Sequence, residues 1–283
     1  MPVISLCDGN LTRTKFVTLV DMVLLLHKGT IEGFDISDKD IENLILSCPL
    51  LTDLRLNSFE GINRLNIKAP KLEYLFVDGD FEDINLDAPN LEVAFLCLDN
   101  KAKAYQSVPI AHEKESYVKQ SLGSLSVIET LTISGFFLKY LSKACIRTKL
   151  PVVFTNLESI FLMICLWDQR QVLTLCSLFQ NAPNLKKVEM LSFPWSIRGQ
   201  DDDQVGIQGL TVQLQMDHLV MASLNHFGGL DWEVDFVAKL LSWAPALEEL
   251  KIEWKGKKDC SMVLANLLAL PRVSTRAKVI VTL

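Results

Sequence analysis

Histidine and cysteine are the residues of this sequence with the widest chemical range, and their spacing decides which sites they could build. None of the four histidines belongs to an HExxH motif or has a cysteine at the spacing of a metal site. Histidines without such neighbours are mostly structural or surface residues. We therefore expect no metal site and no cofactor site. The histidines are His27, His112, His218 and His226.

The seven cysteines predict a reducing compartment rather than a disulfide framework. Their number is odd, they are spread along the chain, and no two of them form a CxxC pair. Such a pattern is typical of reduced, buried thiols in the cytoplasm or nucleus, which is where we expect this protein. The cysteines are Cys7, Cys48, Cys97, Cys145, Cys165, Cys176 and Cys260.

The N-terminal residues do not have the pattern of a secretory signal. A basic stretch followed by a long apolar run and a small-residue cleavage site is not found there. The most apolar stretch, residues 16–27, contains Asp21 and is shorter than the roughly 20 apolar residues that a membrane span needs. We expect no membrane partner.

Motifs that activate a nucleophile or hold a phosphate are absent from the sequence. It contains no GxSxG, no GxGxxG and no GxxxxGK followed by serine or threonine. The three aspartates at 201–203 lack the alternating ligand order of a calcium loop and favour a solvated loop. A net charge of −6, with the lysines and arginines scattered among acids, argues against nucleic-acid binding. We predict that the chain is not an enzyme.

The strongest signal in the sequence is an internal repeat of the form Pro-x-Leu-x-x-Leu-x-Leu. Its first three copies follow Pro49, Pro70 and Pro89, and this spacing lies close to the roughly 20 to 29 residues of a leucine-rich repeat. Two later copies keep the proline, and two others lack it. The seven copies occupy residues 48–58, 69–79, 88–98, 125–135, 154–164, 182–192 and 244–254.

The repeat predicts an α/β leucine-rich-repeat solenoid with one curved, parallel β-sheet. Its last two leucines alternate with polar or variable residues, as in a strand with one buried face. One unit cannot bury this face alone, so successive units must stack. The expected strands are residues 50–57, 71–78, 90–97, 126–134, 155–163, 184–191 and 246–253.

The convex side of the solenoid should carry helices and irregular segments. Apolar residues at helical spacing predict helices over residues 38–48, 171–181 and 233–243. In the first repeats a second set of alternating apolar residues predicts an extended segment instead, which should lie on the outer side. It consists of Leu65, Ile67, Ile84 and Leu86.

We expect one solenoid over residues 1–283. A capping helix and a first strand should lie within residues 11–37, and repeats should fill residues 38–200. A polar insertion, residues 99–122, lacks the repeat, and further repeats with an end cap should fill residues 207–283.

The residues beside the inward leucines should face the concave surface, where solenoids usually bind partners. Several of them are large and apolar, and exposed apolar patches commonly mark interaction sites. The alternative is that the insertion covers them or that curvature buries them against one another. The candidates are Arg55, Tyr74, Phe76, Phe95, Phe161 and Met163.

The ordered set of segments at residues 11–37, 48–56, 64–77 and 84–92 resembles the leucine-rich-repeat region of plant F-box proteins. The closing stretch, which begins HFGGLDWEVDFVAKLLSWAPALEELKIEW at His226, is similar to the FBD region that ends many of them. The resemblance implies a protein-interaction module that recognises the substrate of a ubiquitin ligase, with an unknown target protein as partner.

The same resemblance leaves alternatives open. In the family an F-box precedes the segment that begins here at about Leu11, and residues 1–10 are too few to hold one. A free-standing scaffold or decoy is the first alternative. A small-molecule receptor is less favoured, because arginine and lysine do not cluster enough to hold several phosphates.

The 283-residue chain is accordingly expected not to bind the adaptor of a cullin-type ligase. A stable interface needs about 800 Å² from each partner, and the family's docking helices lie in the F-box. Calorimetry of the purified chain with the adaptor is the measurement. Micromolar or tighter binding would contradict this expectation.

Overall fold

The computed structural model describes ten stretches of the chain. They are residues 28–32, 50–98, 122–123, 125–134, 137–138, 141–142, 150, 152–192, 214–256 and 260–283. The helices expected near residues 16–26 and 38–48, most of the insertion and the aspartates at 201–203 lie outside these residues. The chain divides into two compact units, unit 1 (Met1–Thr132) and unit 2 (Ile133–Leu283).

A tight turn opens most repeats and explains the Ala-Pro-x-Leu pattern. In each such turn the leucine N–H donates to the carbonyl of the alanine three residues earlier, and proline occupies the second position, where its fixed φ is favourable. The turn directs the chain into the strand that follows. These bonds join Leu72 to Ala69 (3.0 Å), Leu91 to Ala88 (3.1 Å), Leu185 to Ala182 (3.2 Å) and Leu247 to Ala244 (3.2 Å).

The start of each strand is fixed against the preceding repeat by a shared acceptor. The N–H groups of Glu73 and Tyr74 both donate to the carbonyl of Thr52, at 2.9 and 3.0 Å. In the next repeat, Glu92 and Val93 donate in the same way to the carbonyl of Glu73, at 2.9 and 3.0 Å. One carbonyl thus satisfies two N–H groups and sets the register between repeats.

Unit 1 contains parallel strands that follow one another in chain order. β1 (Lys28–Glu32), β2 (Asp53–Lys68), β3 (Tyr74–Asp87) and β4 (Val93–Leu98) are successive hydrogen-bonded neighbours. β5 (Thr130–Ile133) follows, with Thr130 N–H donating to the Glu92 carbonyl at 3.0 Å. The predicted strands of this part of the chain are confirmed.

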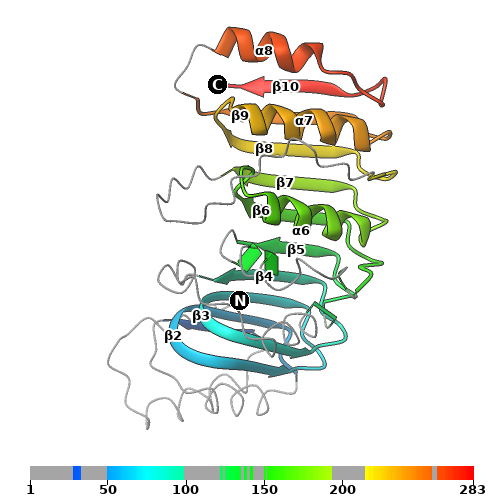
Figure 1. The fold of residues 1–283 in the computed structure, drawn as a ribbon. Coiled ribbons are helices and arrows are strands. Elements are labelled where there is room, and N and C mark those ends of the chain that lie inside the picture. The colour runs from blue at the N-terminus through cyan, green and yellow to red at the C-terminus, as the bar shows by residue number, and fades with distance from the viewer. Residues whose placement is uncertain are drawn as a thin grey trace. The chain divides into compact units, whose positions relative to one another are not determined.

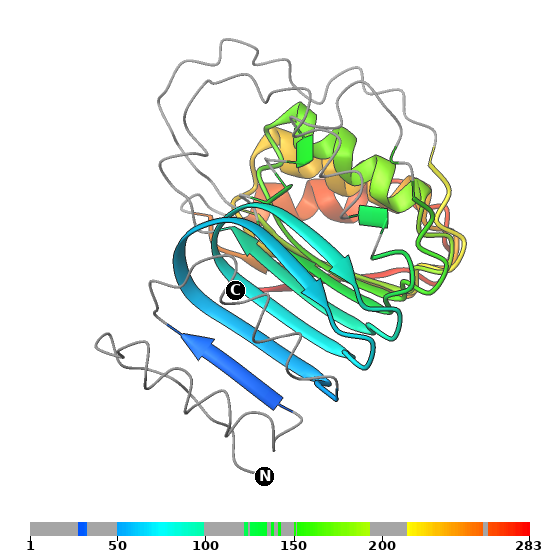
Figure 2. The same ribbon diagram turned by 90° about the horizontal axis from the view of Figure 1, so that it is seen from below.

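β2 and β3 are long because each has two extended limbs. The first limb follows the turn, and the second continues from it. Figure 2 shows both strands bending round on themselves, and their register shifts at residues 57–62. On the second limb Leu65 pairs with Ile84 and Ile67 with Leu86, and all four side chains are buried. Each short repeat therefore encloses its core between two extended limbs, and a helix is not needed there.

Unit 2 has helices on one side of its strands, as Figures 1 and 2 show. Two of the helices, α6 and α7, were expected and are confirmed. The elements are β6 (Ser159–Ile164), α6 (Gln169–Gln180), β7 (Lys187–Ser192), β8 (Met221–Phe227), α7 (Asp231–Trp243), β9 (Glu249–Trp254), α8 (Cys260–Ala269) and β10 (Lys278–Thr282). The strands are parallel neighbours in chain order.

β8, β10 and α8 were not predicted from the sequence. β8 belongs to a repeat whose turn lacks proline, in which Leu219 N–H donates to the Met216 carbonyl at 3.3 Å. Its inward residues are Ala222 and Leu224, both fully buried. This repeat was not predicted because it lacks the Ala-Pro turn and also has an alanine at its first inward position, whereas β4 has Ala94 there but keeps the turn.

A buried carboxylate holds the corner before α7. Glu233 is 3% exposed, and its Oε2 accepts hydrogen bonds from the N–H of Gly228 (2.8 Å) and of Leu230 (3.1 Å). Its Oε1 accepts from the Ser192 hydroxyl at 2.8 Å, which ties this corner to the end of β7. The FGGLDWE sequence therefore has a packing role.

The backbone conformation of this corner requires glycine at position 229. Gly229 has φ +74°, a region that favours glycine, and a Cβ there would lie 2.6 Å from the Trp254 ring. The indole of Trp254 in turn donates to the Gly256 carbonyl at 3.0 Å. A side chain at position 229 would displace this tryptophan.

The inward leucines should contribute most of the free energy of unfolding. Leu75 is 0% exposed, so Leu75→Ala should lower the free energy of unfolding by about 2–5 kcal/mol through lost burial and a residual cavity. Leu50→Ala is the matched control, because Leu50 is 59% exposed and lies in a turn, and its change should stay within about 0.5 kcal/mol. Urea unfolding measures both, and equal effects would contradict the assignment of inward and outward positions.

Candidate partner-binding surface

Three of the candidate residues form one row across unit 1. Strand pairing places Arg55 on β2 beside Phe76 on β3, and Phe76 beside Phe95 on β4. Each lies between two buried residues of its strand, so the three side chains point away from the core. Tyr74 lies two residues before Phe76 on the same face. These four residues are called the unit 1 surface.

Phe76 and Phe95 are stacked against each other. Their ring centroids are 4.3 Å apart and the rings are nearly parallel, at 12°. Both side chains remain partly exposed. An aromatic pair of this kind contributes about 0.5–1.5 kcal/mol beyond burial, so the two rings stabilise one another and still offer a face to solvent.

Arg55 is held in place by two neighbours. Its guanidinium carbon lies 4.8 Å from the centre of the Tyr74 ring, and its Nε donates to Asp53 Oδ1 at 3.3 Å. Its side chain is still 46% exposed, against 12% for Asp53. Asp53 and Tyr74 together therefore orient the arginine before any partner arrives.

The other two candidates, Phe161 and Met163, lie in unit 2. Both are on β6 at outward positions and are partly exposed. Their neighbours on β7 are Glu189 and Leu191. They form a candidate surface separate from that of unit 1.

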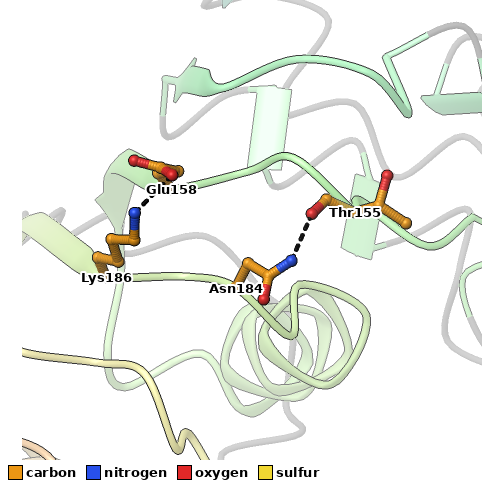
Figure 3. Close-up of polar contacts among 4 residues, drawn as sticks. All are labelled: Thr155, Glu158, Asn184 and Lys186. Atoms are coloured by element: carbon orange, nitrogen blue, oxygen red, sulfur yellow. Dashed lines mark hydrogen bonds and ion pairs between the residues drawn. The ribbon is translucent and has the colours of Figure 1, made fainter.

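Acidic side chains on the strand face of unit 2 are matched by basic ones. Glu249 pairs with Lys251 at 2.8 Å, and Glu189 pairs with Lys187. Just before the strands, Glu158 and Lys186 of adjacent repeats form an ion pair at 2.5 Å (Figure 3). Asn184 beside it donates to the Thr155 carbonyl at 2.7 Å, which links the same two repeats.

Unit 1 has carboxylates at the position where unit 2 has the Glu158–Lys186 pair. Glu73, Glu92 and Glu129 each precede a strand, in three successive repeats, and all three side chains are exposed. Within the described residues none of the three has an ion-pair partner. We call them the acidic row. The sequence did not predict this row, because the three glutamates precede the strands and the alternating pattern covers only positions inside them.

The described residues offer little for covalent or metal chemistry. Burial raises the pKa of the Cys176 thiol to about 11, which leaves it protonated and unreactive near neutral pH. In these stretches of the chain, no three His, Cys, Asp or Glu side chains gather as metal ligands would. Among the described helices, none has the length and apolar character needed to span a membrane.

Comparison with known proteins gives a consistent result. Residues 22–190 match the family model for the LRR repeats of an FBD-associated F-box protein. The chain is 30% identical to an F-box/FBD/LRR-repeat protein of Arabidopsis thaliana over 85% of its length and 58% of the relative's. It is 25% identical to F-box/LRR-repeat protein 13 of the same plant, over 98% of this chain and 66% of that one.

A third relative, an FBD-associated F-box protein of Arabidopsis thaliana, is 23% identical over 87% of this chain and 59% of its own length. The chain therefore spans about 60% of the length of the curated relatives that it matches.

The stacked rings should be energetically coupled. In a double-mutant cycle of Phe76→Leu and Phe95→Leu, the second change should be less destabilising once the first is present, with a coupling of about 0.5–1.5 kcal/mol. Urea unfolding of the four proteins gives this number. Strictly additive effects would show that the rings do not stabilise each other in solution.

Proposed function

Because this chain belongs to the F-box/FBD/LRR-repeat family, we propose that it is the substrate-recognition part of an F-box-type ubiquitin ligase receptor. It binds a target protein at the unit 1 surface. The observation that carries this assignment is the row formed by Arg55, Phe76 and Phe95 on three neighbouring strands. The role in ubiquitination comes from the family alone.

The chemistry of the unit 1 surface supports a protein partner. Arginine and aromatic residues are enriched at the centres of protein interfaces, where they often contribute most of the binding free energy. Here the rings are stacked and the guanidinium is fixed by Asp53 and Tyr74. A surface ordered before binding loses less side-chain entropy when the partner arrives.

In this function the chain performs no catalytic step itself, and the protein works in the cytoplasm or nucleus. Cys176 and Cys260 are free thiols in the structure. Free thiols are typical of a reducing compartment, which supports this localisation.

The test joins the chain to an F-box that binds the adaptor and follows protein abundance in plant cells. We expect at least one protein to bind the fusion directly and to fall in abundance, with recovery when the proteasome is inhibited. The fusion carrying Phe76→Ser and Phe95→Ser should lose both effects, because interface anchors often contribute at least about 2 kcal/mol each. Urea unfolding verifies that this variant remains folded.

Two outcomes would contradict parts of the proposal. Equal binding of the target by the Phe76→Ser, Phe95→Ser variant would place the binding site elsewhere. A target that binds the fusion but keeps its abundance would remove the ligase role and leave a scaffold. The chain without an added F-box is expressed as a further comparison. If it acts as a decoy, it should raise the abundance of the same target.

A further inference from the structure

The two units differ in whether the carboxylates that directly precede their strands have a basic partner. In unit 2, Glu158, Glu249 and Glu253 lie within 3.1 Å of lysine Nζ atoms, and Glu248 lies 3.1 Å from an arginine nitrogen. In unit 1 the acidic row has no such partner among the described residues. Glu158 and Glu248 occupy the position of the acidic row in their own repeats, with the same pattern of backbone bonds, so at these two positions the units differ in their charge partners.

Within the described residues, the acidic row places like charges on neighbouring repeats. Strands of a sheet lie about 4.8 Å apart, so the backbones that carry Glu73, Glu92 and Glu129 are close neighbours. Like charges on adjacent strands destabilise a sheet, and a lysine in place of Glu92, the middle residue of the row, would turn both repulsions into attractions. Lys186 beside Glu158 shows that the fold accepts this solution. Local violations of such rules are expected at functional sites.

The row lies next to the unit 1 surface. Glu73 directly precedes Tyr74, and Glu92 precedes the strand that carries Phe95. Asp78, on the other side of Phe76, adds a partly exposed carboxylate, whereas the charge of Arg55 is matched by Asp53. Lys71 lies in the turn before Glu73 and forms no ion pair with it. Stacked rings are thus bordered by carboxylates that lack counter-charges within the described residues.

We infer that the unit 1 surface binds a basic segment of the target protein, one that combines lysine or arginine side chains with an apolar residue. The apolar residue covers the Phe76–Phe95 stack, and the basic side chains pair with the acidic row. Complementary charge steers association and excludes wrong partners. A cation can also lie over an aromatic face, as Arg55 does over Tyr74. This inference rests on the proposed function and names the class of target.

The experiment uses fluorescein-labelled peptides and the full chain. One probe alternates leucine with lysine, and two probes of the same length carry serine or glutamate in place of lysine. Fluorescence anisotropy should show the lysine probe binding about tenfold tighter than the serine probe, with weakening as salt screens the charges. The glutamate probe should not bind.

Two triple variants with equal changes in net charge locate the effect. Glu73→Gln, Glu92→Gln and Glu129→Gln together should weaken the lysine probe about tenfold and leave the serine probe unchanged. They should also raise the urea midpoint slightly, because repulsion is relieved. The control, Glu158→Gln, Glu189→Gln and Glu249→Gln, removes paired carboxylates of unit 2 and should change probe affinity less than about twofold.

Several outcomes would overturn the inference. They are equal binding of all three probes, no loss in the first triple variant, or an equal loss in the control. Binding of the lysine probe only after removal of residues 101–119 would also overturn it, because the unit 1 surface would then bind this segment of the same chain and not a target. If a target of the fusion protein depends on Phe76 and Phe95 but not on the acidic row, the proposed function stands and this inference fails.

Discussion

The arrangement of each unit depends on one backbone interaction, the carbonyl that accepts two successive N–H groups from the next repeat. It recurs from Thr52, through Glu73 and Glu92, to Glu158 and Lys186. Because this bond sets the register, every inward leucine falls beside the inward residue of the neighbouring strand. A slip of one residue would turn each of them to the outside. Burial of apolar surface then supplies the stability that the hydrogen bond alone would not.

The same register determines what the outward face can do. Side chains at equivalent positions of successive repeats form rows, and a row is uniform or mixed according to the residues that each repeat supplies. Arg55, Phe76 and Phe95 form an aromatic row with a cation at one end. In unit 2 the equivalent positions are Phe161, Glu189, Ser223 and Lys251, and Glu189 and Lys251 each form a salt bridge with a residue of their own strand. One backbone arrangement therefore gives two surfaces of different chemistry.

Much of the fold could be predicted because the inward positions obey a strict pattern. All seven expected strands are present. Each begins about three residues after the first residue of its expected segment, because those first residues form the turn. The missed strands have weaker patterns: β8 has Ala222 at a leucine position and no Ala-Pro turn, and β10 has valines and no Ala-Pro turn. α8 is apolar around most of its circumference, so helical spacing does not reveal it.

The candidate surface was predictable only in part. Alternation within strands identifies Phe76 and Phe95 as outward, but their stacking depends on the register between repeats that differ in length. The role of Asp53 depends on the rotamer of Arg55, and the acidic row requires knowing that Glu73, Glu92 and Glu129 occupy equivalent positions. These relations join residues far apart in the sequence, and a single sequence contains no direct signal for them.

The residues that carry the family resemblance and those that would bind a target lie on different sides of the backbone. The repeat leucines are buried, and Glu233, Gly229 and Trp254 hold a corner of unit 2 together. Such residues are constrained by packing, so they identify the fold and the family but contain little information about a partner. The outward residues are less constrained by packing, because their side chains lie outside the core. Relatives that share the inward pattern can therefore recognise different targets, and the target class of this chain has to be read from its own outward side chains.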